Sequence, residues 1–167
     1  MKTRNEFGQL LKELNLTGYG VELGVAAGSF SKTLLETSAL KILFSIDRWN
    51  DHHDYSQYLA TVHTLAQFRE RSVILRLPFE EAVQLFNNNV FDFIYIDGYA
   101  HTGQDKGRTL HEWWPKVKPG GIFGGHDYST TWPKTIEQVN QFAGCHPYCK
   151  LQFTEEITGQ KDYPSWY

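Results

Sequence analysis

A loop of small residues follows the first short apolar run of the chain. It reads Glu22-Leu-Gly24-Val25-Ala26-Ala-Gly28-Ser29. Small side chains let a ligand approach the backbone closely, and Ser29 can cap the helix that follows. The glycines are spaced G-x-x-x-G, which is looser than the G-x-G-x-x-G of dinucleotide-binding proteins. Taken alone, this loop suits either a bound ligand or a tight turn without one.

A carboxylate, Asp47, closes the second apolar run. At the end of a neighbouring strand it can accept hydrogen bonds from two adjacent ribose hydroxyls of a ligand that lies across the small-residue loop. Arg48 and Trp49 come next, and the indole of Trp49 offers either a stacking surface for adenine or a cover over the core. The loop and the carboxylate together favour a nucleoside ligand.

Two further pairs of residues carry side chains that can accept or donate a proton. Asp97 and His101 follow the fourth apolar run, and His126 and Asp127 follow the fifth. All four can meet over one cleft, where a neutral imidazole is able to accept a hydroxyl proton. We therefore predict catalytic roles for His101, His126 and Asp127. The alternative for His126 and Asp127 is that they are ordinary loop residues whose side chains form hydrogen bonds with the backbone.

The elements that must position these groups alternate between helical and strand patterns. Apolar residues at helical spacing predict helices over 7–14, 29–37, 55–71, 78–86, 102–114 and 135–143. Short apolar runs predict strands over 19–23, 42–46, 73–77, 91–96 and 120–125, with further edge strands over 150–154 and 164–167.

This alternation predicts one α/β domain over residues 1–167. Strands that are apolar throughout and separated by helices belong to a mostly parallel sheet with helices on both faces, here a doubly wound, Rossmann-like sheet. In such a sheet a ligand lies outside the carboxyl ends of the strands, near the point where the strand order reverses.

Four segments, 22–29, 45–47, 91–98 and 113–128, occur in an order that carries a family resemblance over nearly the whole chain. They resemble class I S-adenosylmethionine-dependent methyltransferases, and within them the small bacterial branch of macrocin-type O-methyltransferases. The resemblance implies that the small-residue loop binds the methionine part of S-adenosylmethionine, Asp47 its ribose, and residues 78–80 lie near its adenine. The implied cofactor site comprises Glu22, Gly24, Val25, Ala26, Gly28, Ser29, Asp47, Arg48, Trp49, Pro78, Phe79, Glu80 and Asp97.

The activity implied is transfer of a methyl group to a hydroxyl of a small molecule. A sulfonium donor is already activated, so the protein has to align the acceptor, exclude water and remove a proton. The sequence contains neither a Gly-x-Ser-x-Gly elbow nor a P-loop, which weakens acyl and phosphoryl transfer. Two alternatives stay open: a nicotinamide-dependent oxidoreductase and a non-catalytic nucleoside-binding protein on the same fold.

A divalent metal is a further expectation from the resemblance. Relatives that need one take carboxylates from the ends of the fourth and fifth strands, which makes Asp97 and Asp127 the candidate Mg²⁺ ligands. The usual Asp-Gly-Asp-His is replaced here by Asp97-Gly-Tyr-Ala-His101, without the second acid and with the histidine one place later. Dependence on Mg²⁺ and independence of it therefore both stay open.

Composition limits partners and location. Lys+Arg 16 against Asp+Glu 19 gives a net charge of -3, with no positive field for nucleic acid or an anionic membrane. The apolar runs are shorter than the roughly 20 residues that span a bilayer. With two cysteines and no apolar run of a secretory signal, a cytoplasmic protein is expected. A small-molecule acceptor fits best, and a homo-oligomer stays open because aromatic residues gather near the C-terminus.

Overall fold

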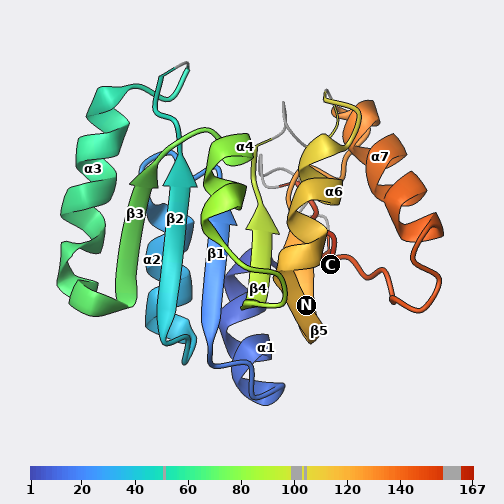
Figure 1. Cartoon of the computed structure of the whole chain (residues 1–167), viewed down its shortest axis with the longest axis horizontal. Helices are drawn as coiled ribbons and strands as arrows, with labels where there is room; N and C mark the ends of the chain where they lie inside the picture. Colours follow the sequence, from blue (N-terminus) through green and yellow to red (C-terminus); the bar gives the residue numbers. More distant parts are fainter. Residues whose placement is uncertain (51, 99–102, 104, 156–162) are drawn as a thin grey trace.

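A computed structural model describes residues 1–50, 52–98, 103, 105–155 and 163–167. Its centre is a five-stranded parallel sheet in the order β3-β2-β1-β4-β5 (Figure 1). The strands are β1 (Tyr19–Leu23), β2 (Ile42–Asp47), β3 (Ser72–Arg76), β4 (Phe91–Ile96) and β5 (Val117–Gly125). The predicted single-domain doubly wound fold is confirmed.

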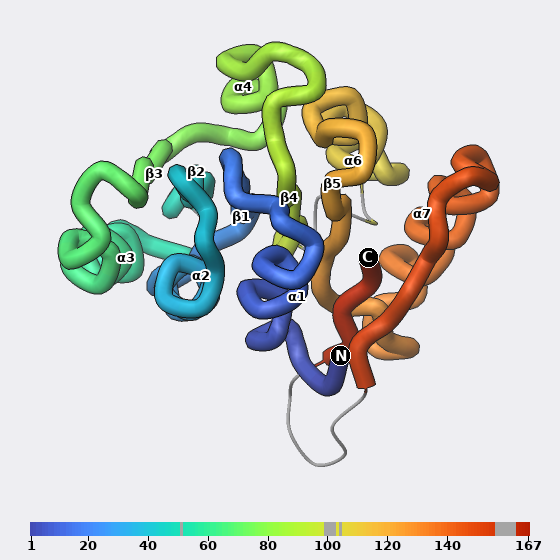
Figure 2. The backbone as a smooth tube through the Cα atoms, turned by 90° about the horizontal axis from the view of Figure 1, so that it is seen from below, coloured from blue at the N-terminus to red at the C-terminus, as the bar shows by residue number. Residues whose placement is uncertain are grey.

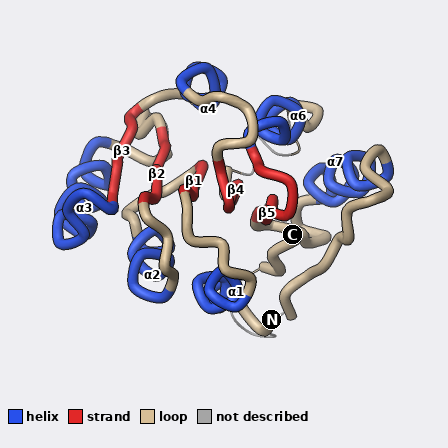
Figure 3. Tube along the Cα trace, turned by 60° about the horizontal axis from the view of Figure 1, so that its bottom comes forward, coloured by secondary structure: helices blue, strands red, loops and turns tan. Residues whose placement is uncertain are grey.

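Helices cover both faces of this sheet (Figures 2 and 3). On one face lie α1 (Phe7–Glu13) and α2 (Ser29–Thr37), with α3 (Tyr55–Leu65) packed beside α2. On the other face lie α4 (Phe79–Ala82) and α6 (Arg108–Trp113), with α7 (Pro133–Gly144) next to α6. Short 3-10 helices are η1 (Arg4–Glu6), η2 (Ala66–Arg71), η3 (Val83–Leu85) and η4 (Trp114–Lys116). Every described helix is too short or too polar to cross a lipid bilayer.

The strand order reverses beside β1, which has β2 on one side and β4 on the other. Leu23 of β1 pairs with Ile46 of β2 and with Ile96 of β4, and Ile96 pairs in turn with Gly125 of β5. Four strands therefore end level with one another. The loops that follow them all begin at the same edge of the sheet, where ligands of such folds bind.

Among the described residues the core forms two apolar clusters, one on each face of the sheet. Successive side chains of a strand point to opposite faces. In β4, Ile94 and Ile96 accordingly pack toward α4 and α6, whereas Phe93 and Tyr95 pack toward α1 and α2. Each large apolar side chain that is fully buried in this way stabilises the fold by about 1.5–3 kcal/mol. The rigid edge from which the functional loops start rests on this packing.

Some element boundaries differ from the predictions because backbone geometry intervenes. The helix predicted over 55–71 is α-helical only to Leu65, and Arg69 in η2 has a φ of 49°. The helix predicted over 102–114 begins at Arg108 after Gly107, whose φ of 73° is left-handed; residues 99–102 and 104 lie outside the described part.

The C-terminal residues pair more sparsely than predicted. The expected strands over 150–154 and 164–167 form isolated antiparallel bridges, in which Trp166 pairs with Gly125 and with Phe153. Trp166 and Gly125, the last residue of β5, exchange two backbone hydrogen bonds of 2.9 Å.

Candidate functional site

A cavity of about 400 Å³ opens at the carboxyl ends of the strands. Its walls come from the loop after β1, from the ends of β2 and β4, and from η1 near the N-terminus. Ten residues predicted from the sequence line it: Glu22, Gly24, Val25, Ala26, Ser29, Asp47, Arg48, Phe79, Asp97 and Asp127. The structure thus brings the small-residue loop and the carboxyl groups of four strands, β1, β2, β4 and β5, to one hollow.

The loop after β1 has a shape that only small residues permit. Gly24 has a φ of 92°, and a Cβ there would lie 2.6 Å from the backbone oxygen of Asp97. Gly28, with a φ of 82°, is the N-cap of α2 and forms no side-chain cap, so the prediction that Ser29 caps this helix is wrong. Ser29 is the first helical residue and lines the cavity.

Asp47 holds this loop in place. Its Oδ2 accepts hydrogen bonds from the backbone N–H groups of Val25 (2.9 Å) and Ala26 (3.1 Å), and its Oδ1 accepts one from Trp49 (3.1 Å). His53 Nδ1 lies 3.2 Å from Oδ2. The residue is only 4% exposed, although it lines the cavity. Most of the carboxylate's capacity to accept hydrogen bonds is therefore used by the protein itself, a role that the sequence did not reveal.

Trp49 lies in the interior instead of lining the cavity. It is 1% exposed, its indole N–H donates to the backbone oxygen of Ala26 (2.7 Å), and its ring packs on Tyr58 at 5.1 Å. Of the two interpretations of this indole, the structure favours the cover over the core. Gly28, Pro78, Glu80 and His126 are described as well, and none of them lines the cavity.

Asp97, His126 and Asp127 form a cluster at the ends of β4 and β5. His126 Nδ1 lies 2.9 Å from Asp127 Oδ1 and 3.4 Å from Asp97 Oδ1. Asp127 has a left-handed backbone with a φ of 62°. Three of the four predicted proton-handling groups thus meet. The fourth, His101, lies outside the described residues.

The charges in this cluster depend on one another. Burial raises the pKa of Asp97, while His126 and Arg4 oppose that rise. Burial disfavours the imidazolium of His126, but the hydrogen bond to Asp127 and the charge of Asp97 outweigh it, so the pKa of His126 is raised. A histidine whose protonated form is favoured by two neighbouring carboxylates is suited to hold them together.

Glu22 is a second perturbed acid in the cavity wall. It is 1% exposed, and burial raises its pKa to about 8. The hydroxyl of Ser31 donates to it, and Ser31 in turn lies 2.7 Å from the hydroxyl of Ser45. The carboxyl group of Glu22 is therefore largely neutral at physiological pH.

Arg4 was not foreseen from the sequence. Its NH1 lies 2.5 Å from Asp97 Oδ2, and its guanidinium lies over the ring of Phe30, 5.1 Å from the centroid. It lines the cavity, as do His52 and His53 of the loop before α3. Since Arg4 and Asp97 are 93 positions apart, no local pattern signals their contact.

The two predicted Mg²⁺ ligands, Asp97 and Asp127, meet with His126, and one ligand atom of each lies within 4.8 Å of the others. Mg²⁺ is usually held by one or two carboxylates and several waters, but here positive groups accompany the carboxylates. Asp97 Oδ2 is already paired with Arg4, and the imidazole of His126, which tends to be charged, lies between Asp97 and Asp127. A divalent cation bound here would either lie close to the positive groups of Arg4 and His126, which repel it, or have to displace them.

The strand order defines a Rossmann-like α/β domain, and the cavity lies at its topological switch point, where ligands of such folds bind. A family model described as a methyltransferase domain matches residues 20–128, which include β2 to β5 and all of β1 except Tyr19. The chain belongs to this methyltransferase-domain family. No curated protein sequence shows significant similarity to it.

Solved structures share the fold at low sequence identity. A candidate caffeoyl-CoA O-methyltransferase from Staphylococcus aureus is 19% identical, with 98% of this chain and 80% of that chain covered and a TM-score of 0.70. An O-methyltransferase from Bacillus cereus, solved with S-adenosylhomocysteine, is 13% identical, with coverages of 98% and 77% and a TM-score of 0.71. A candidate rRNA methylase from Clostridium thermocellum is also 13% identical, with coverages of 99% and 93% and a TM-score of 0.71. These likenesses establish the fold alone.

Proposed function

We propose that this chain is an S-adenosylmethionine-dependent methyltransferase that methylates a hydroxyl group of a small molecule, within the macrocin-type O-methyltransferases. The observation that carries the proposal is the strand-end cavity, in which the small-residue loop, Asp47 and Asp97 meet in a chain of the methyltransferase-domain family. Its volume of about 400 Å³ falls in the usual range for a small-ligand site. The S-adenosylhomocysteine bound to the Bacillus cereus O-methyltransferase of the same fold supports the choice of cofactor.

The cofactor is proposed to lie across β1. The loop of residues 24–29 receives its methionine part, Asp47 lies beside its ribose, and Phe79 borders its adenine. Arg48 lines the cavity next to Asp47. Because Asp47 already accepts three backbone N–H groups, its first contribution is to hold the loop in the shape that receives the ligand.

When bound, S-adenosylmethionine supplies an activated methyl group: the O–CH₃ bond forms while the S–CH₃ bond breaks and leaves its electron pair on sulfur. This chain has to orient the acceptor, exclude water and take up the hydroxyl proton. We assign the proton to the carboxylate of Asp127, which lines the cavity 2.9 Å from His126. His126 is assigned a positioning role between Asp97 and Asp127, and His101 remains a candidate outside the described residues.

Titration with three ligands tests the cofactor. S-adenosylmethionine and S-adenosylhomocysteine should each stabilise the protein in thermal unfolding, by about 2.7 kcal/mol at 100 times the dissociation constant. NAD⁺ should give no shift. Stabilisation by NAD⁺, with none by the other two, would replace the proposal with the oxidoreductase alternative.

Transfer to a panel of hydroxyl-bearing small molecules tests the reaction. Asp127→Asn should lower the rate of methyl transfer roughly 10²- to 10⁴-fold, the usual contribution of a general base, and leave the affinity for S-adenosylhomocysteine unchanged. Glu137→Gln, an exposed position on α7, is the matched control and should change neither quantity. Cofactor binding without turnover on any acceptor would favour the non-catalytic alternative, and methylation of RNA alone would contradict a small-molecule acceptor.

A further inference from the structure

Arg4 contributes a cationic side chain to the cavity wall, although it lies outside the segment that the family model matches. It lies in η1, ahead of residues 20–128 that the family model matches. Its guanidinium is held between Asp97 at the end of β4 and the ring of Phe30 in α2. The side chains of Arg4 and Asp97 are 27% and 21% exposed, so the ion pair is partly shielded from water. Partly buried charges are screened less by salt than charges on the open surface.

The position of Arg4 relative to the strands decides which end of the cofactor it faces. Asp47 and Arg48 stand at the end of β2, whereas Arg4 stands with Asp97 at the end of β4, on the other side of β1. A cofactor with its ribose beside Asp47 and its sulfur over the loop of β1 directs its amino-acid end toward β4. That end carries a carboxylate and an ammonium group.

From this juxtaposition we infer that Arg4 binds the carboxylate of the cofactor's amino-acid end, with Asp97 next to its ammonium group. The inference rests on the proposed function and names the group that recognises one part of the cofactor. A guanidinium presents its N–H donors in a planar fork that matches the two oxygens of a carboxylate. Adjacent opposite charges of the protein match the adjacent opposite charges of an α-amino acid.

Two ligands that differ in the amino-acid end test this role. S-adenosylhomocysteine carries that end, and 5′-methylthioadenosine has the same nucleoside and a thioether without it. Calorimetric titration of Arg4→Gln should show 10- to 100-fold weaker binding of S-adenosylhomocysteine, or about 1.4–2.8 kcal/mol, and the parent affinity for 5′-methylthioadenosine. Arg4→Lys, which keeps the charge, should recover part of the loss.

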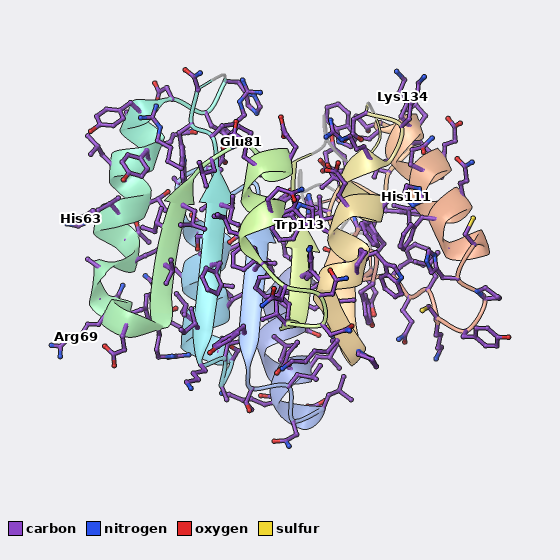
Figure 4. All side chains as sticks on the ribbon, in the orientation of Figure 1. His63, Arg69, Glu81, His111, Trp113 and Lys134 are labelled. Atoms are coloured by element: carbon purple, nitrogen blue, oxygen red, sulfur yellow. The ribbon has the colours of Figure 1, made fainter. Side chains whose placement is uncertain are left out.

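Arg69→Gln is the matched control, because Arg69 is an exposed arginine at the opposite end of the strands from the cavity (Figure 4). It should bind both ligands as the parent does. A second measurement needs no variant: decarboxylated S-adenosylmethionine, which keeps the amine but lacks the carboxylate, should bind the parent protein at least tenfold more weakly than S-adenosylmethionine. This comparison keeps the inference testable even if Arg4→Gln folds poorly.

The outcomes separate the inference from the proposed function. Equal losses for S-adenosylhomocysteine and 5′-methylthioadenosine in Arg4→Gln would show that Arg4 acts only by holding the cavity wall. No loss for either would show that Arg4 does not contribute to binding, and either result would overturn the inference. Equal affinity of the parent for S-adenosylmethionine and its decarboxylated form would overturn it as well. Failure of the parent to bind S-adenosylhomocysteine at all would overturn the proposed function, and the inference with it.

Discussion

Replacement of Asp47 by alanine should destabilise the protein even when no ligand is present. The carboxylate accepts three backbone N–H groups, from Val25, Ala26 and Trp49, at 2.9–3.1 Å. Hydrogen bonds to a charged group contribute about 1.5–3 kcal/mol each, which sets an upper bound of roughly 5–9 kcal/mol. Because the loop borders the cavity, water can satisfy part of the loss, and we expect about 3–5 kcal/mol.

Urea and thermal unfolding of ligand-free protein measure this loss. A domain of this size loses about 2–4 °C of Tm per kcal/mol, so Asp47→Ala should unfold roughly 6–20 °C below the parent. Glu36→Gln, a half-exposed acid paired with Lys32 in α2, is the control and should stay within about 0.5 kcal/mol. If ligand-free Asp47→Ala unfolds at the parent temperature and only its cofactor affinity falls, Asp47 acts on the ligand alone and the loop-holding role is refuted.

Three further predictions concern titration and metal. The pKa of Glu22 is raised to about 8, so the folded state binds a proton there more tightly than the unfolded state does. The stability of the ligand-free protein should therefore fall between about pH 4.5 and 8. Urea unfolding at pH 5 and pH 8 should show this decline in the parent and not in Glu22→Gln. The raised pKa of His126 means that its protonated form stabilises the folded state below pH 6.5, and this stability is lost as the pH rises through the pKa of the folded state. The loss of unfolding free energy in His126→Gln should therefore be smaller at pH 9 than at pH 6. An equal loss at both pH values would contradict the charged cluster. Calorimetric affinity for S-adenosylhomocysteine and the methyl-transfer rate should agree within twofold in EDTA and in excess Mg²⁺, whereas loss of transfer in EDTA would restore Asp97 and Asp127 as metal ligands.

The elements around the site were predictable because their signals are local. The strands Tyr19–Leu23 and Phe91–Ile96 and the helix Ser29–Thr37 have the bounds that hydrophobic periodicity predicts. Each is a short apolar run or a helical repeat bounded by small or polar residues, so neighbouring residues suffice to define it. The parallel sheet followed from their alternation, and the shared edge of the strand-end loops followed from the sheet.

Side-chain roles at that edge were less predictable. Asp47 and Trp49 were recognised as neighbours of a ligand loop, but their main partners are the backbone groups of that loop itself. An aspartate or a tryptophan can form hydrogen bonds with a ligand as readily as with backbone groups of the protein. The choice depends on how closely the end of β2 approaches the loop of β1, which the spacing of residues does not specify.

The sequence by itself determined the succession of strands and helices along the chain, the parallel sheet and the strand ends at which chemistry could take place. These features follow from hydrophobic periodicity and chain connectivity, which act over short distances along the chain. Only the tertiary structure decided that Arg4 meets Asp97, that His126 lies between two carboxylates, and that Glu22 is buried deeply enough to hold its proton. Those outcomes depend on distances and desolvation between segments far apart in the chain. Charge and protonation at the site are therefore properties of the folded arrangement, whereas its location is already a property of the sequence.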